Sequence, residues 1–269
     1  KMNSAPIGIF DSGIGGLTIA HALKKTLPNE NIIYFGDTKH LPYGEKSSKV
    51  IRTFCKEITK FLISKKCKAI IIACNSASSV GYNSVKKIAK KIPVFNAVEP
   101  IIENIHNKIN NNIIGVIGTK ATIQSKIYKQ KITEKCPSAK VCELATPLLA
   151  PMIEEGFINE DISHTVIKNY LSNEKLKSID YLVLACTHYP LIFNEIKNYY
   201  HDKPVCIINS AKIIANYIAK ELKNRLLLNH QKKPKYYFYV SNYTNSFEKS
   251  ANFFFKEDIK LEEVQLTNL

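Results

Sequence analysis

The sequence has no apolar run close to the ~18 residues that a membrane-spanning helix needs, and no basic segment followed by an apolar stretch opens it. We therefore expect a cytoplasmic protein that does not associate with a membrane. It also has no C-x-x-C spacing, and its seven cysteines are an odd number. Structural zinc sites favour closely spaced cysteine pairs, and disulfide frameworks favour even sets, so we expect neither a metal nor disulfides.

Arginine is scarce, although the formal net charge is +15. Only Arg52 and Arg225 are present, and lysine supplies the other 36 of the 38 basic residues, scattered in ones and twos. Base recognition and bidentate phosphate contacts favour arginine, so the composition argues against a nucleic-acid partner. The charge indicates a lysine-rich solvated surface, which can also attract an anionic substrate.

No long Pro-, Gly- or Ser-rich linker divides the 269 residues, and strand and helix patterns alternate from end to end. This alternation predicts an α/β protein with mainly parallel sheets. Amphipathic patterns predict helices over 47–64 and 209–228. Strands are predicted over 7–10, 31–35, 69–73, 94–96, 113–117, 141–144, 181–185, 205–208 and 236–240.

One phrase occurs twice: an apolar run that ends in a cysteine and is followed at once by small polar residues. The first copy, 69–76, contains Cys74, and the second, 181–188, contains Cys186. Each run reads as a buried parallel strand, and open α/β sheets place ligand crevices at the carboxyl ends of such strands. The 112-residue spacing predicts two similar α/β domains that face each other across a cleft, residues 1–97 with 210–269 and residues 98–209.

Two thiols that face one crevice from opposite sides suit a racemase that needs no cofactor. One thiol removes a proton from a carbon, and the other returns a proton to the opposite face. A lone cysteine after an apolar strand is usually an inert small hydrophobe. Two of them with matched polar successors, Asn75 and Ser76 in one case and Thr187 and His188 in the other, favour a functional pair.

A glycine-rich turn follows the first strand, in the segment 11–17. Such a turn and the helix start after it can approach an anionic ligand closely. A dinucleotide-binding loop does not fit, because Thr18 stands where the third glycine would be needed, and no Gly-Lys-Ser/Thr follows for a phosphate loop. Asp11 at the strand end is either a helix cap or a group that assists a thiol.

Several motifs, in order along nearly the whole chain, resemble those of the glutamate racemase family. They are Phe-Asp-Ser-Gly-Ile-Gly-Gly at 10–16, Leu-Pro-Tyr-Gly at 41–44, Ala-Cys-Asn-Ser-Ala-Ser at 73–78, Glu-Pro at 99–100, Gly-Thr-Lys-Ala-Thr at 118–122, Pro-Met-Ile-Glu-Glu-Gly at 151–156 and Ala-Cys-Thr-His-Tyr-Pro at 185–190. Individually several of these motifs are weak, but together and in this order they are very specific.

The resemblance implies a PLP-independent enzyme that interconverts L- and D-glutamate and supplies D-glutamate for peptidoglycan, with no cofactor. It also implies that Cys74 and Cys186 are the acid-base pair, that Asp11 lies near Cys74, and that Glu154 and His188 lie near Cys186. The implied substrate contacts are Asp11, Ser12, Pro42, Tyr43, Gly44, Cys74, Asn75, Ser76, Thr119, Thr122, Cys186, Thr187 and His188.

These residue types also suit the chemistry on their own terms. A free thiol has a pKa of about 8.5, so a site that works near neutrality must favour a thiolate on one side and a thiol on the other. His188 can share a proton with Cys186, and Asp11 can do so for Cys74. A negative Asp11 opposes a thiolate, so it fits better as a proton acceptor or hydrogen-bond partner. Without an electron sink, fixed donors in a dry site must stabilise the carbanion-like transition state.

The sequence departs from the family pattern at two places. Ser76 stands where the family usually has Thr, a change that keeps the hydroxyl, and 241–243 replaces a Ser-Gly-Asp turn. We expect this second segment to be remote from the site and activity to be independent of it. Members of the family associate in different ways, and a homodimer is the favoured arrangement here.

Three alternatives stay open on the sequence. An aspartate racemase of the same superfamily usually opens with a Gly-Gly-Met-Gly-Pro-like segment, unlike the Asp-Ser-Gly at 11–13. A cysteine-histidine hydrolase predicts one indispensable thiol and an acyl-enzyme, whereas a racemase predicts two thiols and no covalent intermediate. A lysine-rich nucleic-acid-binding protein predicts steep salt dependence and indifference to loss of Cys74.

Overall fold

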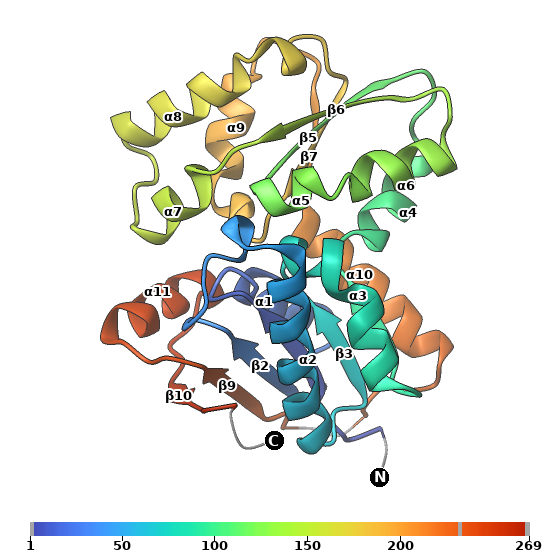
Figure 1. The fold of residues 1–269 in the computed structure, drawn as a ribbon, viewed down its shortest axis with the longest axis vertical. Coiled ribbons are helices and arrows are strands. Elements are labelled where there is room, and N and C mark those ends of the chain that lie inside the picture. The colour runs from blue at the N-terminus through green and yellow to red at the C-terminus, as the bar shows by residue number, and fades with distance from the viewer. Residues whose placement is uncertain (1–2, 231–232, 267–269) are drawn as a thin grey trace.

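The computed structural model describes residues 3–230 and 233–266. It contains two parallel β-sheets, one above the other in Figure 1, each with helices packed on both faces. The strands are β1 (Ile7–Asp11), β2 (Ile32–Gly36), β3 (Ala69–Ile72), β4 (Val94–Asn96), β5 (Ile113–Gly118), β6 (Lys140–Ala145), β7 (Tyr181–Ala185), β8 (Cys206–Ile208), β9 (Tyr236–Val240) and β10 (Leu261–Glu263).

The connections between strands are mostly helical. The α-helices are α1 (Leu17–Thr26), α2 (Ser48–Ser64), α3 (Asn75–Ala89), α4 (Glu99–His106), α5 (Lys120–Gln124), α6 (Ile127–Lys135), α7 (Leu149–Glu154), α8 (Asp161–Leu171), α9 (Phe193–Tyr199), α10 (Ser210–Asn224) and α11 (Asn245–Phe255). Three short 3₁₀ turns are η1 (Tyr43–Glu45), η2 (Glu174–Leu176) and η3 (Tyr189–Ile192).

The two sheets share one strand order. The larger sheet runs β10-β9-β2-β1-β3-β4 and the smaller runs β6-β5-β7-β8, and every paired strand is parallel. In each half, the first strand along the chain lies between the second and the third: β1 lies between β2 and β3, and β5 lies between β6 and β7. The predicted α/β class with two similar parallel sheets is therefore confirmed, and the duplicated cysteine phrase follows the third strand of each half.

The apolar runs explain why these strands are central. All residues of β1 and β3 are buried, and so is every residue of β7 after Tyr181. A strand covered by helices on both faces needs apolar side chains at every position instead of at alternate ones. Burying each Ile or Leu stabilises the fold by roughly 1.5–3 kcal/mol relative to exposure, so these runs fix which segments form the centre of each sheet.

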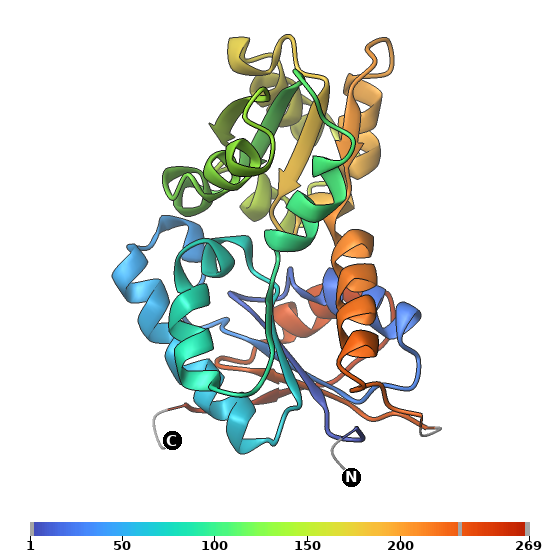
Figure 2. The ribbon, with the colours of Figure 1, turned by 90° about the vertical axis from the view of Figure 1, so that its right-hand side faces the viewer.

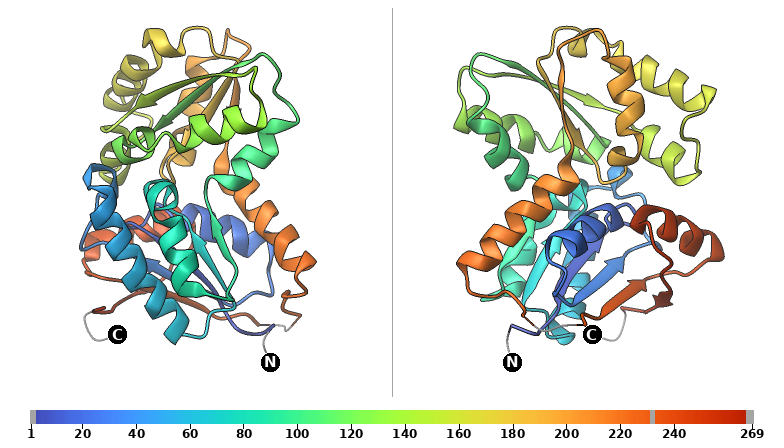
Figure 3. Two further views of the ribbon diagram at one scale, coloured as in Figure 1. Left: turned by 45° about the vertical axis from the view of Figure 1, so that its right-hand side comes forward. Right: turned by 180° about the vertical axis from the view of Figure 1, so that it is seen from behind.

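The chain passes between the two sheets twice. It leaves the larger sheet after β4 and enters α4, and it returns after β8 through α10, as Figure 2 shows from the side. In the two views of Figure 3, α4 lies where the two layers meet, and α10 begins there and runs along the larger sheet. One apolar core cluster contains buried residues of both sheets together with α4 and α10. The carboxyl ends of the strands in both halves therefore face one another.

Two features differ from the sequence-based expectation. Strand β10 was not predicted, because its Leu-Glu-Glu sequence has no apolar pattern and its place is set by parallel pairing with β9 at the sheet edge. Helix α10 ends at Asn224 instead of 228, since Leu226 adopts a left-handed φ of 56°. The amides of Leu226 and Leu227 then bond the carbonyls of Lys223 and Leu222, a Schellman ending formed without the usual glycine.

Buried thiols make the larger half sensitive to alkaline pH. Cys67 is 3% exposed, and burial raises its pKa to about 12. Its contribution to stability is complete below the unfolded pKa of about 8.5 and is lost progressively as the pH rises toward the folded pKa, because only the unfolded chain releases the proton. Between pH 7.5 and pH 10, the free energy of unfolding measured with urea should therefore fall by about 2 kcal/mol less in Cys67→Ala than in wild type. An equal fall in the two proteins would contradict this prediction.

Candidate active site

A cavity of about 190 Å³ lies between the two sheets, at the carboxyl ends of β1, β3, β5 and β7. Both cysteines of the duplicated phrase line it, one from each half of the molecule. The lining residues are Ser12, Leu41, Pro42, Tyr43, Gly44, Cys74, Asn75, Ser76, Thr119, Ala150, Pro151, Glu154, Cys186, Thr187 and His188. The structure thus brings together all but two of the residues singled out in the sequence.

Cys74 occupies the N-cap position of α3. Its sulfur accepts a hydrogen bond from the Ala77 amide at 3.4 Å, and the residue is 5% exposed. Burial, and after it the negative charge of Asp11, raises the pKa of the Cys74 thiol to about 12, while the Ala77 amide and the Ser12 side chain oppose the rise. At neutral pH Cys74 therefore favours the thiol form.

Cys186 faces a histidine-glutamate pair. Its sulfur lies 3.6 Å from Nδ1 of His188, and Nε2 of the same ring lies 2.7 Å from Glu154 Oε1 on α7. Burial lowers the pKa of His188, but the Cys186 sulfur and the Glu154 carboxylate outweigh it, so the pKa rises well above its ordinary value. The ring is held as an imidazolium between two acceptors, and Cys186 has a positive partner that Cys74 lacks.

Asp11 is fully buried beneath the cavity and is not among the residues that line it. One carboxylate oxygen accepts the Gly13 amide at 3.1 Å, and the other accepts the Thr187 hydroxyl at 3.4 Å. Burial raises the pKa of Asp11, and the charge of His188 opposes the rise. The carboxylate lies close enough to Cys74 for its charge to raise the pKa of that thiol, and it also joins the two halves through Thr187.

Thr122 is the second predicted contact that lies outside the cavity lining. It is fully buried on α5, where its amide and hydroxyl both contact the Thr119 hydroxyl, the side chain that caps this helix. Thr119 in turn hydrogen-bonds the Ser76 hydroxyl across the two halves at 2.7 Å. The hydroxyl of Ser76 thus makes a hydrogen bond to the other half of the molecule, and Thr122 holds the Thr119 side chain in place through its own contacts with the Thr119 hydroxyl.

Tyr43 enters the cavity on η1 and is anchored by a buried carboxylate outside it. Its hydroxyl donates to Asp37 Oδ2 at 2.5 Å, and Ser241, after β9, donates to Asp37 Oδ1 at 2.7 Å. The ring of His40 also contacts Asp37, at 2.9 Å. The expectation that 241–243 is remote from the site is therefore wrong, because two hydrogen bonds connect Ser241 to a residue that lines the cavity.

Ser241→Ala is expected to raise the KM for the substrate about threefold to tenfold and to change kcat less. Loss of one hydrogen bond to a buried carboxylate costs about 1–2 kcal/mol, and it loosens Asp37 and with it the Tyr43 side of the cavity. Steady-state racemisation would measure both constants. Ser241→Thr, which keeps the hydroxyl, is the matched control, and an unchanged KM in Ser241→Ala would contradict the connection.

Gly15 permits the closest approach between the two halves. A Cβ atom at this position would lie 2.5 Å from Cε1 of His188 and 2.6 Å from the Thr187 hydroxyl oxygen. The neighbouring Thr18 hydroxyl donates to the Thr187 carbonyl at 3.0 Å. The loop between β1 and α1 therefore holds the Thr187-His188 turn by direct contact, and only glycine fits there.

Gly15→Ala is expected to lower kcat about tenfold to a hundredfold, because the added methyl group must displace the imidazole of His188, and small displacements of reacting groups have large kinetic effects. The measurement is the racemisation rate at saturating glutamate. Gly13→Ala is the matched control, since its methyl group would meet only Leu41 Cδ2 at 3.4 Å. Equal rates for the two variants would contradict the steric argument.

Sequence reasoning did not assign a role to several residues at the site. Leu41, Ala150 and Pro151 line the cavity, and the Phe254 ring of α11 packs edge-on against His188 with 5.4 Å between ring centroids. Leu41, Ala150 and Pro151 lie within or beside the family-like motifs, and this position is what could have identified them as cavity residues from the sequence. Phe254 had none, since an aromatic residue on an apolar helix face usually indicates core packing.

The described residues, 3–230 and 233–266, contain no group of three or more His, Cys, Asp or Glu side chains placed to hold a metal ion. Over the same residues, no helix is both long and apolar enough to cross a membrane.

The chain matches the family model for Asp/Glu/hydantoin racemases over residues 17–218. It is 38% identical over 270 residues to glutamate racemase 3 of Caldanaerobacter subterraneus subsp. tengcongensis, which covers 100% of this chain and 97% of that protein. The crystal structure of Francisella tularensis glutamate racemase in complex with D-glutamate superposes with a TM-score of 0.93 at 40% identity, covering 99% of this chain and 100% of that one.

The chain therefore belongs to the Asp/Glu/hydantoin racemase family of amino-acid racemases. Within this family it belongs with the glutamate racemases, given the identity and full-length coverage above. An aspartate racemase from Picrophilus torridus is only 18% identical with a TM-score of 0.57, a likeness of fold alone.

Proposed function

We propose that the protein interconverts L- and D-glutamate by proton transfer between Cys74, Cys186 and the α-carbon, without PLP, and that it supplies D-glutamate for peptidoglycan. One observation carries the proposal: both sulfur atoms line a single cavity of about 190 Å³, and they reach it from opposite halves of the molecule. A planar, carbanion-like α-carbon between them can receive a proton on either face. Glutamate as the substrate rests on the similar proteins.

The two thiols have different neighbours. The raised pKa of Cys74 keeps it a thiol, while the imidazolium of His188 lies beside the Cys186 sulfur and can stabilise negative charge that develops there. Cys186 thus serves as the base for the enantiomer whose α-hydrogen faces it. Cys186 takes that proton, Cys74 gives its own proton to the opposite face, and the product leaves the pair with its protons exchanged.

Asp11 serves the reverse direction. When Cys74 must become the base, its proton needs an acceptor, and the raised pKa of the buried Asp11 carboxylate makes proton uptake less costly there than for an exposed aspartate. On the Cys186 side the imidazolium of His188, backed by Glu154, instead stabilises negative charge on the sulfur. Each thiol thus has its own ionisable neighbour, and Thr187 hydrogen-bonds Asp11 directly before His188 in the chain.

Fixed polar groups lower the cost of the carbanion. Asn75, Ser76 and Thr187 are each less than 5% exposed and line the cavity beside the thiols, so they can hold the substrate carboxylate without water between. Donors preorganised in a site that excludes water stabilise developing charge far more than the same donors in bulk solvent. Ser12, Pro42, Tyr43, Gly44 and Thr119 complete the substrate-facing wall.

The deciding experiment is incubation with L-glutamate in heavy water, without added PLP or metal. Optical rotation should decay to zero while deuterium enters the α-position. Folded protein that shows neither change would reject the proposal. D-glutamate and L-aspartate serve as comparisons, the first expected to react and the second to be a poor substrate.

We further propose that residues 1–97 with 210–269 form one domain and residues 98–209 the other, a division supported by the sheet to which each strand belongs. We propose a cytoplasmic location, where the reducing environment keeps catalytic thiols free. A homodimer is supported by the exposed apolar side chains of Leu148, Phe157 and Ile162 around α7 and α8. Light scattering of the purified protein tests the last point.

A further inference from the structure

Asn75, directly after Cys74, has a half-satisfied side-chain amide. The residue is 3% exposed and lines the active-site cavity. Its Oδ1 accepts a hydrogen bond of 2.6 Å from the hydroxyl of Tyr128, while its Nδ2 is buried and has no partner in the described part of the chain. Leaving a buried amide N–H₂ unpaired costs about 1–3 kcal/mol, so the group needs a partner that the folded chain does not provide.

The kind of group that the Asn75 amide can bind in the cavity depends on which end of the amide is hydrogen-bonded to Tyr128. With Oδ1 held by the phenol, the N–H₂ end remains for the cavity and can donate to a substrate carboxylate oxygen. In the opposite orientation Oδ1 would remain, and it would repel that carboxylate. The choice therefore depends on the Tyr128 hydroxyl acting as a donor.

Tyr128 is suited to that task. It is 1% exposed, and burial, reinforced by the nearby Cys186 sulfur, raises the pKa of its phenol, so it keeps its proton at every pH at which the enzyme works. The hydroxyl is therefore always available to donate. The rigid ring, locked in the core, leaves little freedom for the bond to be made elsewhere.

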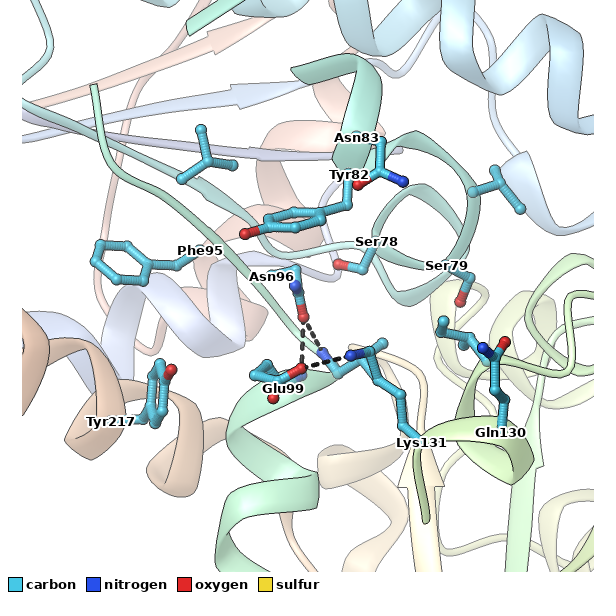
Figure 4. A pocket seen from close by; sticks show the side chains of 14 residues that line it. Ser78, Ser79, Tyr82, Asn83, Phe95, Asn96, Glu99, Gln130, Lys131 and Tyr217 are labelled. Carbon is cyan, nitrogen blue, oxygen red and sulfur yellow. Dashed lines mark hydrogen bonds and ion pairs between the residues drawn. The ribbon is translucent and has the colours of Figure 1, made fainter. Parts of the chain in front are cut away.

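The bond also crosses between the two halves. Tyr128 lies on α6, which packs with the smaller sheet, and Asn75 begins α3 on the larger sheet, as Figure 1 shows. Farther along, α3 and α6 border a second cavity of about 550 Å³, shown in Figure 4 with Ser79 and Asn83 on one side and Gln130 and Lys131 on the other. The two helices are not packed together there, so the Tyr128 to Asn75 bond joins them at the end next to the thiols.

We propose that Tyr128 is a positioning residue that orients the Asn75 amide toward the substrate carboxylate when the two halves are closed. This inference rests on the proposed racemase function and adds a residue on the opposite half of the molecule to the carboxylate-binding group. It assigns to the phenol a role in substrate affinity that ring packing alone would not have.

The test is Tyr128→Phe, which removes the hydroxyl and keeps the ring. The KM for both glutamate enantiomers should rise about tenfold, with kcat changed less than threefold, because the lost orientation weakens substrate binding. Tyr200→Phe is the matched control: Tyr200 is 4% exposed, its buried hydroxyl has no hydrogen-bond partner among the described residues, and its loss should leave both constants unchanged.

A double-mutant cycle separates positioning from packing. Asn75→Ala should raise the KM at least as much as Tyr128→Phe, and adding Tyr128→Phe to Asn75→Ala should raise it no further, since the phenol then has nothing to orient. Additive effects, or an unchanged KM in Tyr128→Phe, would overturn the inference. Wild-type protein that does not exchange the α-hydrogen of glutamate would instead reject the racemase function itself.

Discussion

Cys74→Ala is expected to lower racemisation about a thousandfold while leaving one enantiomer able to exchange its α-hydrogen. General acid-base groups contribute roughly 10²–10⁴-fold, and Cys74 is the one thiol among the residues that line the described cavity from the larger half. Cys186 with His188 and Glu154 remains intact and can still take the proton that faces it. In heavy water Cys186 returns deuterium to the same face, so this enantiomer gains deuterium without inversion.

Cys186→Ala should give the mirror result, with exchange confined to the other enantiomer. The measurement is mass spectrometry of glutamate separated by chirality, after incubation of each enantiomer in heavy water. Cys206→Ala, which removes an exposed thiol, is the control and should match wild type. Either variant racemising at the wild-type rate, or exchanging both enantiomers equally, would contradict the two-thiol proposal. A cysteine-histidine hydrolase would need only one of the two thiols.

The sequence predicted the parts of this protein that depend on local patterns. The buried strand runs before Cys74 and Cys186 identified β3 and β7, and the small polar residues after them identified the cavity wall. Strands β4, β7 and β9 begin and end at the predicted residues. These features are predictable because a doubly covered strand must be apolar throughout and must end where the chain turns to solvent or ligand.

Contacts between distant segments could not be predicted in this way. Ser241 meets Asp37 across 204 residues of sequence, and Tyr128 meets Asn75 across 53. A serine after a strand and a tyrosine on a helix have the same local appearance whether they bond a functional side chain or merely fill the core. Their roles depend on how the two sheets are placed, which no single segment encodes. The same holds for Phe254 against His188.

The two halves of the site differ in how they manage charge, although their strands follow one order. On the Cys74 side the neighbour is a buried carboxylate, and on the Cys186 side it is an imidazolium backed by a carboxylate. A negative neighbour disfavours a thiolate, and a positive neighbour favours negative charge on a sulfur. Under the proposed function, the difference between Asp11 and His188 would therefore let the two thiols take opposite roles, one as acid and one as base, on a duplicated scaffold.

His188→Asn is expected to lower kcat about a hundredfold at pH 7.5 and to recover part of that loss as the pH rises toward 9.5. The raised pKa of His188 means that wild type keeps the imidazolium beside the Cys186 sulfur from neutral into alkaline pH, where its charge can stabilise negative charge on that sulfur during proton transfer. Asparagine places an amide near the position of Nδ1, beside the Cys186 sulfur, but it carries no charge and is too short to replace Nε2 at Glu154. Negative charge on the sulfur is then less stabilised, and a higher pH, which favours the thiolate of an ordinary thiol, offsets part of the loss.

The measurement is kcat between pH 6.5 and 9.5 for wild type, His188→Asn and Glu154→Gln. The kcat of wild type should change little above neutrality, and the kcat of His188→Asn should rise with pH over this range. Glu154→Gln should show a smaller loss in the same direction, because the imidazolium remains but loses one acceptor. His164→Asn, an exposed histidine paired with Glu195, should match wild type. A flat profile for His188→Asn would mean that His188 acts by shape and not by charge.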